Sequence, residues 1–347
     1  MSSALSTNSR KPAPTRSACL AAVAILALTS ASQRLPAAET DQFLAWGVEL
    51  ADSSPELNRY VNRQFEEELA ELGRRRSEGP CEAVPGRLYL RVFKTLLNAP
   101  VRDYLRTDDE IDRFPGSDVG FWEFRDETIF RKVTWPFFLP MSRTVRIGDV
   151  YMGVDKISHF FGFGRRYHSR YQRALRRGLT PEEAQRKVVL WGLRAERFFV
   201  GGVTDGIISH ADLEANYQGF RMALDMCRGD DPYLERTADG WRLRRPVDVA
   251  EYVNPAFDES YNTNHYHPYR WHLVQPILVE EVCPLLDSEP VRRRLARYRE
   301  LDPGSFSRQV ISERYGRNEN PLPVRHSLQA ACGIPLPVAN DRLAASW

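Results

Sequence analysis

The sequence predicts a mainly α-helical protein with a glycine-rich core of three packed helices, small β-hairpins and an irregular, disulfide-tied C-terminal part. Three observations support this class. Apolar residues recur at helical spacing in several segments, glycines lie within and between the helices expected over residues 154–228, and Pro-rich stretches separate the segments. Apolar residues make up 42% of the 347 residues, which is enough to bury a sizeable core.

The first 38 residues have the order of a secretory signal peptide. Basic residues precede an unbroken apolar run over residues 18–28, and small residues follow it. The alternative is a buried N-terminal helix. The run is too short to span a bilayer, and no later stretch is apolar for long enough, so we expect no transmembrane span in the mature chain. The sequence therefore predicts a periplasmic or secreted protein, and the dominance of Arg over Lys indicates a bacterial source.

Removal of this segment changes the charge and the cysteine count. The chain carries 48 Lys and Arg, 46 Asp and Glu, and five cysteines, for a net charge of +2. Cleavage near residue 31 removes three cations and Cys19, which leaves a net charge of −1. A charge this close to zero argues against a nucleic-acid partner. An even number of cysteines in an exported protein indicates two disulfides, with three pairings open. The remaining cysteines are Cys81, Cys227, Cys283 and Cys332.

The N-terminal part alternates between helical and irregular patterns. Apolar residues at helical spacing predict helices over residues 55–76 and 87–98. Residues 107–140 are rich in Pro and aromatic residues, which predicts extended, irregular packing. Residues 144–151 alternate around a Gly-Asp pair and predict a short hairpin.

Three helices then form the best-defined part of the chain. The first is expected over residues 154–177 and ends at a glycine. The second begins at Thr180, which forms a capping box with Glu183, and ends at residues 201–202. The third begins at Ser209 and ends near residue 229.

The residue pattern of the sequence changes after residue 229. A hairpin is expected around residues 237–240, a polar and aromatic loop over 254–276, and a basic helix over 289–300, whose arginines we interpret as a solvated face. The sequence thus predicts a helical domain over residues 39–228 and a C-terminal part over residues 229–347 that packs on it.

A polar constellation lies on the three central helices. The spacing of four residues places Asp155 with His159, and Asp212 with Asn216, on one face of each helix. Glycines beside these positions indicate close approach of the helix backbones. The full set is Asp155, Lys156, His159, Glu196, Asp205, His210, Asp212 and Asn216.

Two interpretations of this set remain open. In the first, it is a buried structural network in which Lys156 and Asn216 satisfy the acidic groups and His159. In the second, it is a metal centre of a hydrolase that acts on an envelope lipid or glycan. Zinc or manganese would then be the metal, because imidazole and carboxylate ligands suit both. Its ligands would be Asp155, His159, Glu196 and Asp212, with Asp205 or His210 as the general base. A structural network should be sealed by Phe160, Phe163 and Trp191, whereas a catalytic one should open onto a cleft.

A second imidazole cluster lies in the expected loop over residues 254–276. His265 and His267 would face the same side of an extended segment, as a metal pair requires. The alternative is an aromatic loop that covers the core. A third alternative is a module that presents residues 261–272 to a binding partner. The neighbouring Asp258 and Glu259 could add carboxylates to such a metal pair, but we interpret their adjacent charges as a solvated face.

The segment over residues 150–225 resembles small bacterial envelope proteins. It reads Asp155-Lys-Ile-Ser-His159-Phe160, then Glu196, Asp205, and Ser209-His-Ala-Asp212-Leu-Glu-Ala-Asn216 with Gly219. This order is similar to the D-K-x-x-H-F … E … D-L-x-A-N-x-x-G pattern of YfiM-like lipoproteins and, more loosely, of VanZ-like proteins. The resemblance implies a cell-envelope setting and a glycine-rich helical core, and it brings no established reaction. Six arginines over residues 165–177 depart from a VanZ-like membrane span.

Overall fold

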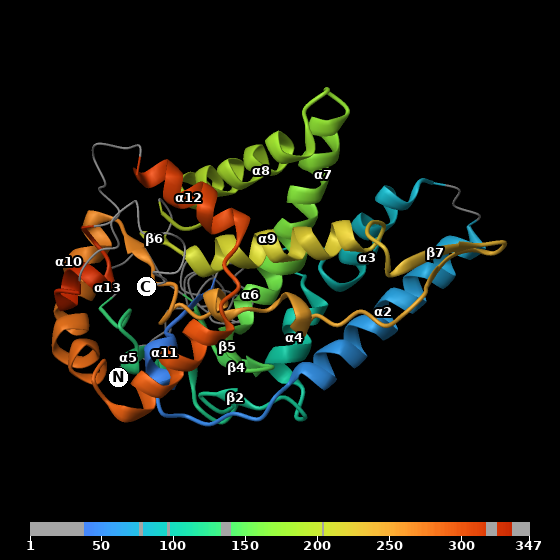
Figure 1. The fold of residues 1–347 in the computed structure, drawn as a ribbon. Coiled ribbons are helices and arrows are strands. Elements are labelled where there is room, and N and C mark those ends of the chain that lie inside the picture. The colour runs from blue at the N-terminus through green and yellow to red at the C-terminus, as the bar shows by residue number, and fades with distance from the viewer. Residues whose placement is uncertain are drawn as a thin grey trace, which may run out of the picture. The chain divides into compact units, whose positions relative to one another are not determined.

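Helices form most of the described chain. Of the three predicted between residues 154 and 228, the first begins at its centre and the third lies there, whereas the second lies toward its edge (Figure 1). The computed structural model describes residues 38–75, 79–95, 98–132, 140–202, 205–316 and 325–334. The chain divides into two units, Met1–Pro36 and Ala37–Trp347. The predicted signal peptide lies outside the described residues, except for its last residue.

The first central helix contains a change of helical type that the sequence pattern did not reveal. It begins as α6 (Val154–Ser158), passes through a π-helical turn over His159–Phe163, and continues as α7 (Gly164–Leu175). The second helix, α8 (Pro181–Ala195), also ends in a π-helical turn, over Glu196–Val200. The third helix is α9 (His210–Asp225).

The predicted helix starts of α8 and α9 are confirmed. Thr180 accepts a hydrogen bond from the Glu183 backbone N–H, and the Glu183 carboxylate accepts one from the Thr180 backbone N–H, which completes the capping box. Ser209 accepts from the Asp212 backbone N–H in the same way. Each cap satisfies a donor that the first helical turn leaves without a partner.

Glycines allow the central helices to approach closely, as predicted. A Cβ added at Gly164 of α7 would lie 2.7 Å from the carbonyl carbon of Gly219 in α9. A Cβ added at Gly219 would collide with the Phe160 carbonyl oxygen. Only glycine fits at these two positions, and the resulting contact brings the polar face of α9 against the start of the first helix.

The helices before residue 130 differ from the prediction. The helix expected over residues 87–98 is α3 (Val84–Val92), which starts earlier because Pro85 occupies its first turn. The expectation of irregular structure over residues 107–140 is wrong for α5 (Phe121–Glu127), and residues 133–139 lie outside the described residues. The structure also contains α2 (Ser54–Arg74), close to its predicted span, and α4 (Pro100–Thr107), which the sequence analysis did not predict.

The strands are short and lie in small sheets. Both predicted hairpins are confirmed, as β4 (Thr144–Ile147) with β5 (Val150–Gly153), and β7 (Leu234–Thr237) with β8 (Gly240–Leu243). Other short strands connect distant parts of the chain. These are β1 (Glu39–Thr40) parallel to β3 (Met141–Ser142), β2 (Arg113–Phe114) antiparallel to β4, and β6 (Ile207–Ile208) antiparallel to β9 (His265–Tyr266).

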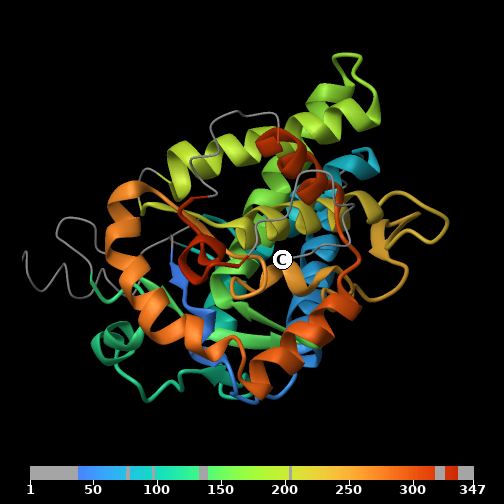
Figure 2. The ribbon, with the colours of Figure 1, turned by 60° about the vertical axis from the view of Figure 1, so that its left-hand side comes forward.

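The C-terminal part contains more helix than predicted. Part of the loop expected over residues 254–276 is instead a helix, α10 (Pro268–Ile277), which has proline in its first turn. The basic helix is confirmed as α11 (Glu289–Leu301). It is followed by α12 (Phe306–Gly316), which lies beside α8 in Figures 1 and 2, and by α13 (Leu328–Cys332).

The four cysteines form two disulfides. Cys81 pairs with Cys227, so this bond connects the segment before α3 to the end of α9. Cys283 pairs with Cys332, so it ties α13 to the segment after α10. The second bond confirms the disulfide-tied C-terminal part. None of the helices in the described residues has the length and apolar character that a membrane crossing requires.

Candidate functional site

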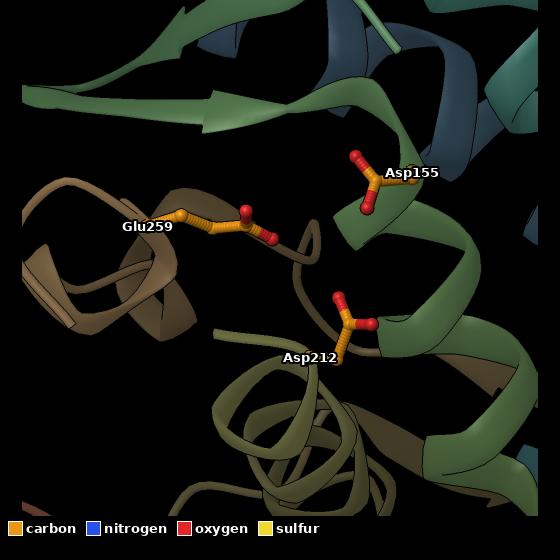
Figure 3. Close-up of side chains that lie close together, drawn as sticks. All are labelled: Asp155, Asp212 and Glu259. Atoms are coloured by element: carbon orange, nitrogen blue, oxygen red, sulfur yellow. The ribbon is translucent and has the colours of Figure 1, made fainter. Parts of the chain in front are cut away.

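The polar constellation is centred on the ammonium group of Lys156. Its side chain is fully buried at the start of α6. The Nζ atom lies 2.5 Å from Asp155 Oδ2, 2.7 Å from Asp212 Oδ1 and 2.5 Å from Glu259 Oε1. Figure 3 shows these three carboxylates pointing toward one another from α6, α9 and the segment before β9. One buried cation therefore joins three separate segments of the chain.

The hydroxyl and amide groups around the centre hold the carboxylates in place. Thr40 Oγ1 donates to Asp155 Oδ1 at 2.6 Å, which connects β1 to α6. Ser209 Oγ donates to Glu259 Oε1 at 3.0 Å, and Asn264 Nδ2 donates to Glu259 Oε2 at 2.7 Å. The ammonium thus shares two of its three carboxylates, those of Asp155 and Glu259, with neutral donors, which compensates part of the cost of burying these charges.

His159 lies beside this centre and is held by α9. Its Nε2 lies 3.1 Å from Asp212 Oδ2, and its Nδ1 lies 3.1 Å from Asn216 Oδ1. Asp212 and Asn216 are four residues apart, so their side chains lie on one face of α9, as predicted. Both contact the His159 imidazole. The π-helical turn begins at His159.

Aromatic rings cover the imidazole. Phe163 stacks on His159 with ring centroids 5.3 Å apart, and Trp191 of α8 stacks on Phe163 at 6.3 Å. Phe160 was also expected here but packs on Phe161 and Tyr252 instead. His159 is 7% exposed, and Asp155, Lys156, Asp212 and Glu259 are no more exposed than that. Two of the three expected rings, Phe163 and Trp191, thus lie over the imidazole, and the side chains of the centre are buried.

Burial and neighbouring charges shift the pKa values of Asp155, Lys156 and Glu259 in different directions. Burial by itself would raise the pKa of Asp155, but the adjacent Lys156 ammonium holds this pKa below its usual value. Burial would lower the pKa of Lys156, but Asp155, Asp212 and Glu259 raise it well above its usual value. Burial raises the pKa of Glu259 to about 7 against the opposing effect of Lys156. Lys156 therefore remains charged at neutral pH.

Two further buried carboxyl groups lie near the centre and favour their neutral form. Burial, followed by the charges of Glu259 and Asp212, raises the pKa of Glu39 well above its usual value. Burial and the charge of Asp212 do the same to the pKa of Glu196, which accepts a hydrogen bond from the Ser209 backbone N–H. The buried region therefore holds more carboxyl groups than one ammonium can neutralise, and protonation removes the excess charge.

The other predicted site residues lie apart from the three carboxylates around Lys156. The backbone carbonyl of Asp205 accepts a hydrogen bond from Arg270 Nε at 2.8 Å. His210 Nε2 lies 3.2 Å from His265 Nδ1. Burial lowers the pKa of His210 to about 4, and burial and His210 together lower the pKa of His265 well below its usual value. Both rings are thus neutral at neutral pH and form a pair of their own.

Glu259 belongs to this centre, although the sequence placed it beside the second imidazole cluster or on a solvated face. The expectation that Asp258 and Glu259 form a solvated face is wrong, because both side chains are buried. The available signal was composition, since residues 258–264 contain polar and acidic residues but no lysine or arginine, between an apolar and an aromatic segment. The module presenting residues 261–272 is also not supported, because Tyr261, Tyr266 and Trp271 are buried.

The donor set of the centre is one that could also hold a divalent cation. Asp155, Asp212 and Glu259 each offer a carboxylate oxygen, and these oxygens lie within 4.8 Å of one another. Lys156 Nζ contacts all three side chains, so a metal ion would compete with the ammonium for the same position. Comparisons with family models, curated proteins and solved structures found no similar protein.

Proposed function

We propose that this chain is an exported protein of the bacterial cell envelope, periplasmic or secreted, whose buried centre is structural and not catalytic. One observation carries this proposal. The fully buried Lys156 ammonium lies within 2.7 Å of carboxylates from α6, α9 and the segment before β9. The charged lysine gives each of the three carboxylates a contact with an opposite charge without a metal ion.

The position of the centre supports a structural role. It joins segments that are far apart in the sequence, because Lys156 and Glu259 are separated by 103 residues. Burying such charges is costly unless each one is paired and hydrogen-bonded, so the network favours the one packing that satisfies them all. The aromatic cover over His159 limits access from solvent.

The disulfides support the proposed location. Cys81–Cys227 and Cys283–Cys332 use all four cysteines that follow the predicted signal peptide. Disulfides of this kind persist in the periplasm and outside the cell, whereas the cytosol keeps thiols reduced. The resemblance to YfiM-like proteins points to the same compartment.

Metal analysis of the purified protein tests the structural role. We expect substoichiometric zinc and manganese by elemental analysis, and a melting temperature that neither a chelator nor added metal changes. A stoichiometric metal together with a melting temperature lowered by the chelator would contradict the proposal. Fractionation of bacteria that express the full chain tests the location, and a cytoplasmic chain with reduced cysteines would contradict it.

A second candidate function is a metal-dependent hydrolase that acts on an envelope lipid or glycan. Two observations favour it. The carboxylates of Asp155, Asp212 and Glu259 lie close together, and the His159 imidazole contacts Asp212. In that case Lys156 would have to withdraw when metal binds. The same metal analysis separates the two functions, because the hydrolase requires bound metal and the structural network does not.

A further inference from the structure

The hairpin of α7 and α8 carries a concentration of positive charge that the net charge of the chain conceals. Residues 164–200 contain ten of the 48 basic residues and three of the 46 acidic ones, which gives the segment a formal charge of +7. The rest of the chain therefore has a formal charge of −5. Of the three acidic residues, Glu196 is buried, and its raised pKa favours the neutral form.

Few of these cations are paired. Among the ion pairs of the described residues, the ten basic residues contribute one, between Arg186 and Glu313 of α12. The exposed acidic residues of the segment are Glu182 and Glu183 at the start of α8, and Glu183 is held in the capping box. The hairpin therefore presents largely uncompensated charge to solvent.

The cations and aromatic residues lie in two helical stripes. Arg166, Arg170 and Arg173 recur on one face of α7, at intervals of four and three residues. Lys187, Trp191 and Arg194 recur in the same way on α8. The stripes meet where the guanidinium of Arg170 lies over the Trp191 ring, 3.5 Å from its centroid.

An exposed aromatic residue extends the stripe of α8. Phe198 lies one turn beyond Arg194, and its side chain is 54% exposed. Figure 1 shows the turn between α7 and α8 extending away from the neighbouring labelled helices, whereas Phe198 follows the other end of α8. Clustered arginines with an exposed aromatic ring are typical of surfaces that bind the headgroups and the shallow apolar layer of an anionic membrane.

We propose that the α7–α8 hairpin docks on an anionic phospholipid membrane. The guanidinium groups of the two stripes bind headgroup phosphates, for which their planar donors suit bidentate contacts. Phe198 enters the interfacial layer beside them. This interaction does not depend on the role of the buried centre.

Co-sedimentation of the full chain with vesicles tests the proposal. We expect binding to vesicles of phosphatidylglycerol and phosphatidylcholine, weakening as salt is added, and much weaker binding to phosphatidylcholine alone. The Arg173→Gln/Arg194→Gln variant should bind the anionic vesicles about tenfold more weakly. The matched control is Arg292→Gln/Arg299→Gln, which removes two exposed arginines of α11 and should bind like the unaltered chain.

A third variant separates a membrane from a soluble polyanion. Phe198→Ser keeps the charge of the hairpin and should also weaken binding to anionic vesicles. Equal binding by Phe198→Ser and the unaltered chain would overturn the membrane as the partner. An equal loss in the α11 control, or binding to heparin without binding to vesicles, would overturn the proposal too.

Discussion

The ammonium of Lys156 lies 2.5 Å from the carboxylate of Glu259, and both side chains are buried. Lys156 belongs to α6, whereas Glu259 lies in the segment between α9 and β9. This contact, with those to Asp155 and Asp212, makes one cation the partner of three carboxylates. The stability of the fold should therefore depend strongly on Lys156.

Replacement of Lys156 by methionine should destabilise the protein by about 3–5 kcal/mol, because it leaves buried carboxylates without their cation. Urea unfolding measures the change. Lys187→Met is the matched control, since Lys187 is exposed on α8 and has no ion pair among the described residues. A loss below about 1 kcal/mol would show that the network contributes little to stability.

Removal of the whole Lys156 side chain should create a cation site. In Lys156→Ala the three carboxylate oxygens, which lie within 4.8 Å of one another, lose their ammonium partner. A divalent cation can take that place, because carboxylates are its preferred ligands. We expect added manganese or zinc to raise the melting temperature of Lys156→Ala and to leave that of the unaltered chain unchanged. An equal rise in both proteins would favour the metal-dependent alternative.

The sequence predicted the features of the site that depend on local spacing. Thr180, Ser209 and their helix starts follow from capping chemistry within a few residues. The placement of Asp212 and Asn216 on one face of α9 also follows from spacing within one helix. Their contact with His159 of the first central helix depends on tertiary packing. Glu259 could not be found in this way, because its contact with Lys156 depends on tertiary packing that brings distant segments together.

Two errors in the predicted fold involve proline at the start of a helix. Pro268, at the start of α10, was interpreted as part of a loop, although proline suits the first helical turn. Pro100 likewise lies in the first turn of α4, a helix that was not predicted. In α5, aromatic residues next to Pro- and Gly-rich sequence concealed a short helix. The arginines of α7 were recognised in the sequence as a departure from a membrane span, but they were not interpreted as a charged surface.

Glu196 should make a contribution to the stability of the protein that is lost as pH rises above about 5. Unfolded Glu196 loses its proton near its usual pKa of 4.5, whereas burial raises its pKa in the folded protein. The folded state therefore binds more protons in this range, and its stability decreases as pH rises. Glu196→Gln should reduce the loss of stability between pH 5 and pH 8, because the glutamine side chain does not titrate.

Unfolding free energies at a series of pH values measure this effect. His210 and His265 act in the opposite direction below their usual pKa of 6.5, because their pKa values are lowered in the folded protein. The difference between Glu196→Gln and the unaltered chain cancels their contribution. The exposed Glu182→Gln serves as the control. Parallel pH curves for Glu196→Gln and the unaltered chain would mean that Glu196 ionises alike in both states.

Peptide mapping without reduction should find two linked pairs, Cys81 with Cys227 and Cys283 with Cys332. The other two pairings of these four cysteines should be absent. Replacement of both Cys81 and Cys227 by serine should cost about 2–5 kcal/mol, because the bond closes a loop of 146 residues in the unfolded chain. Mixed pairings in protein secreted from cells would contradict the arrangement of α3, α9 and α13.

Replacement of Gly219 by alanine should be far more destabilising than the same change at Gly86. The new Cβ at Gly219 would collide with the Phe160 carbonyl oxygen and push α9 away from the π-helical turn, at a cost of about 3 kcal/mol. Gly86 in α3 has no neighbouring atom within 4 Å of an added Cβ, so alanine there should stabilise the helix by about 0.5–1 kcal/mol. Thermal melts of the two variants compare the effects directly. Similar melting temperatures would mean that α9 tolerates displacement. The contact of His159 with Asp212 and Asn216 would then not depend on the close approach of α9 to the first central helix.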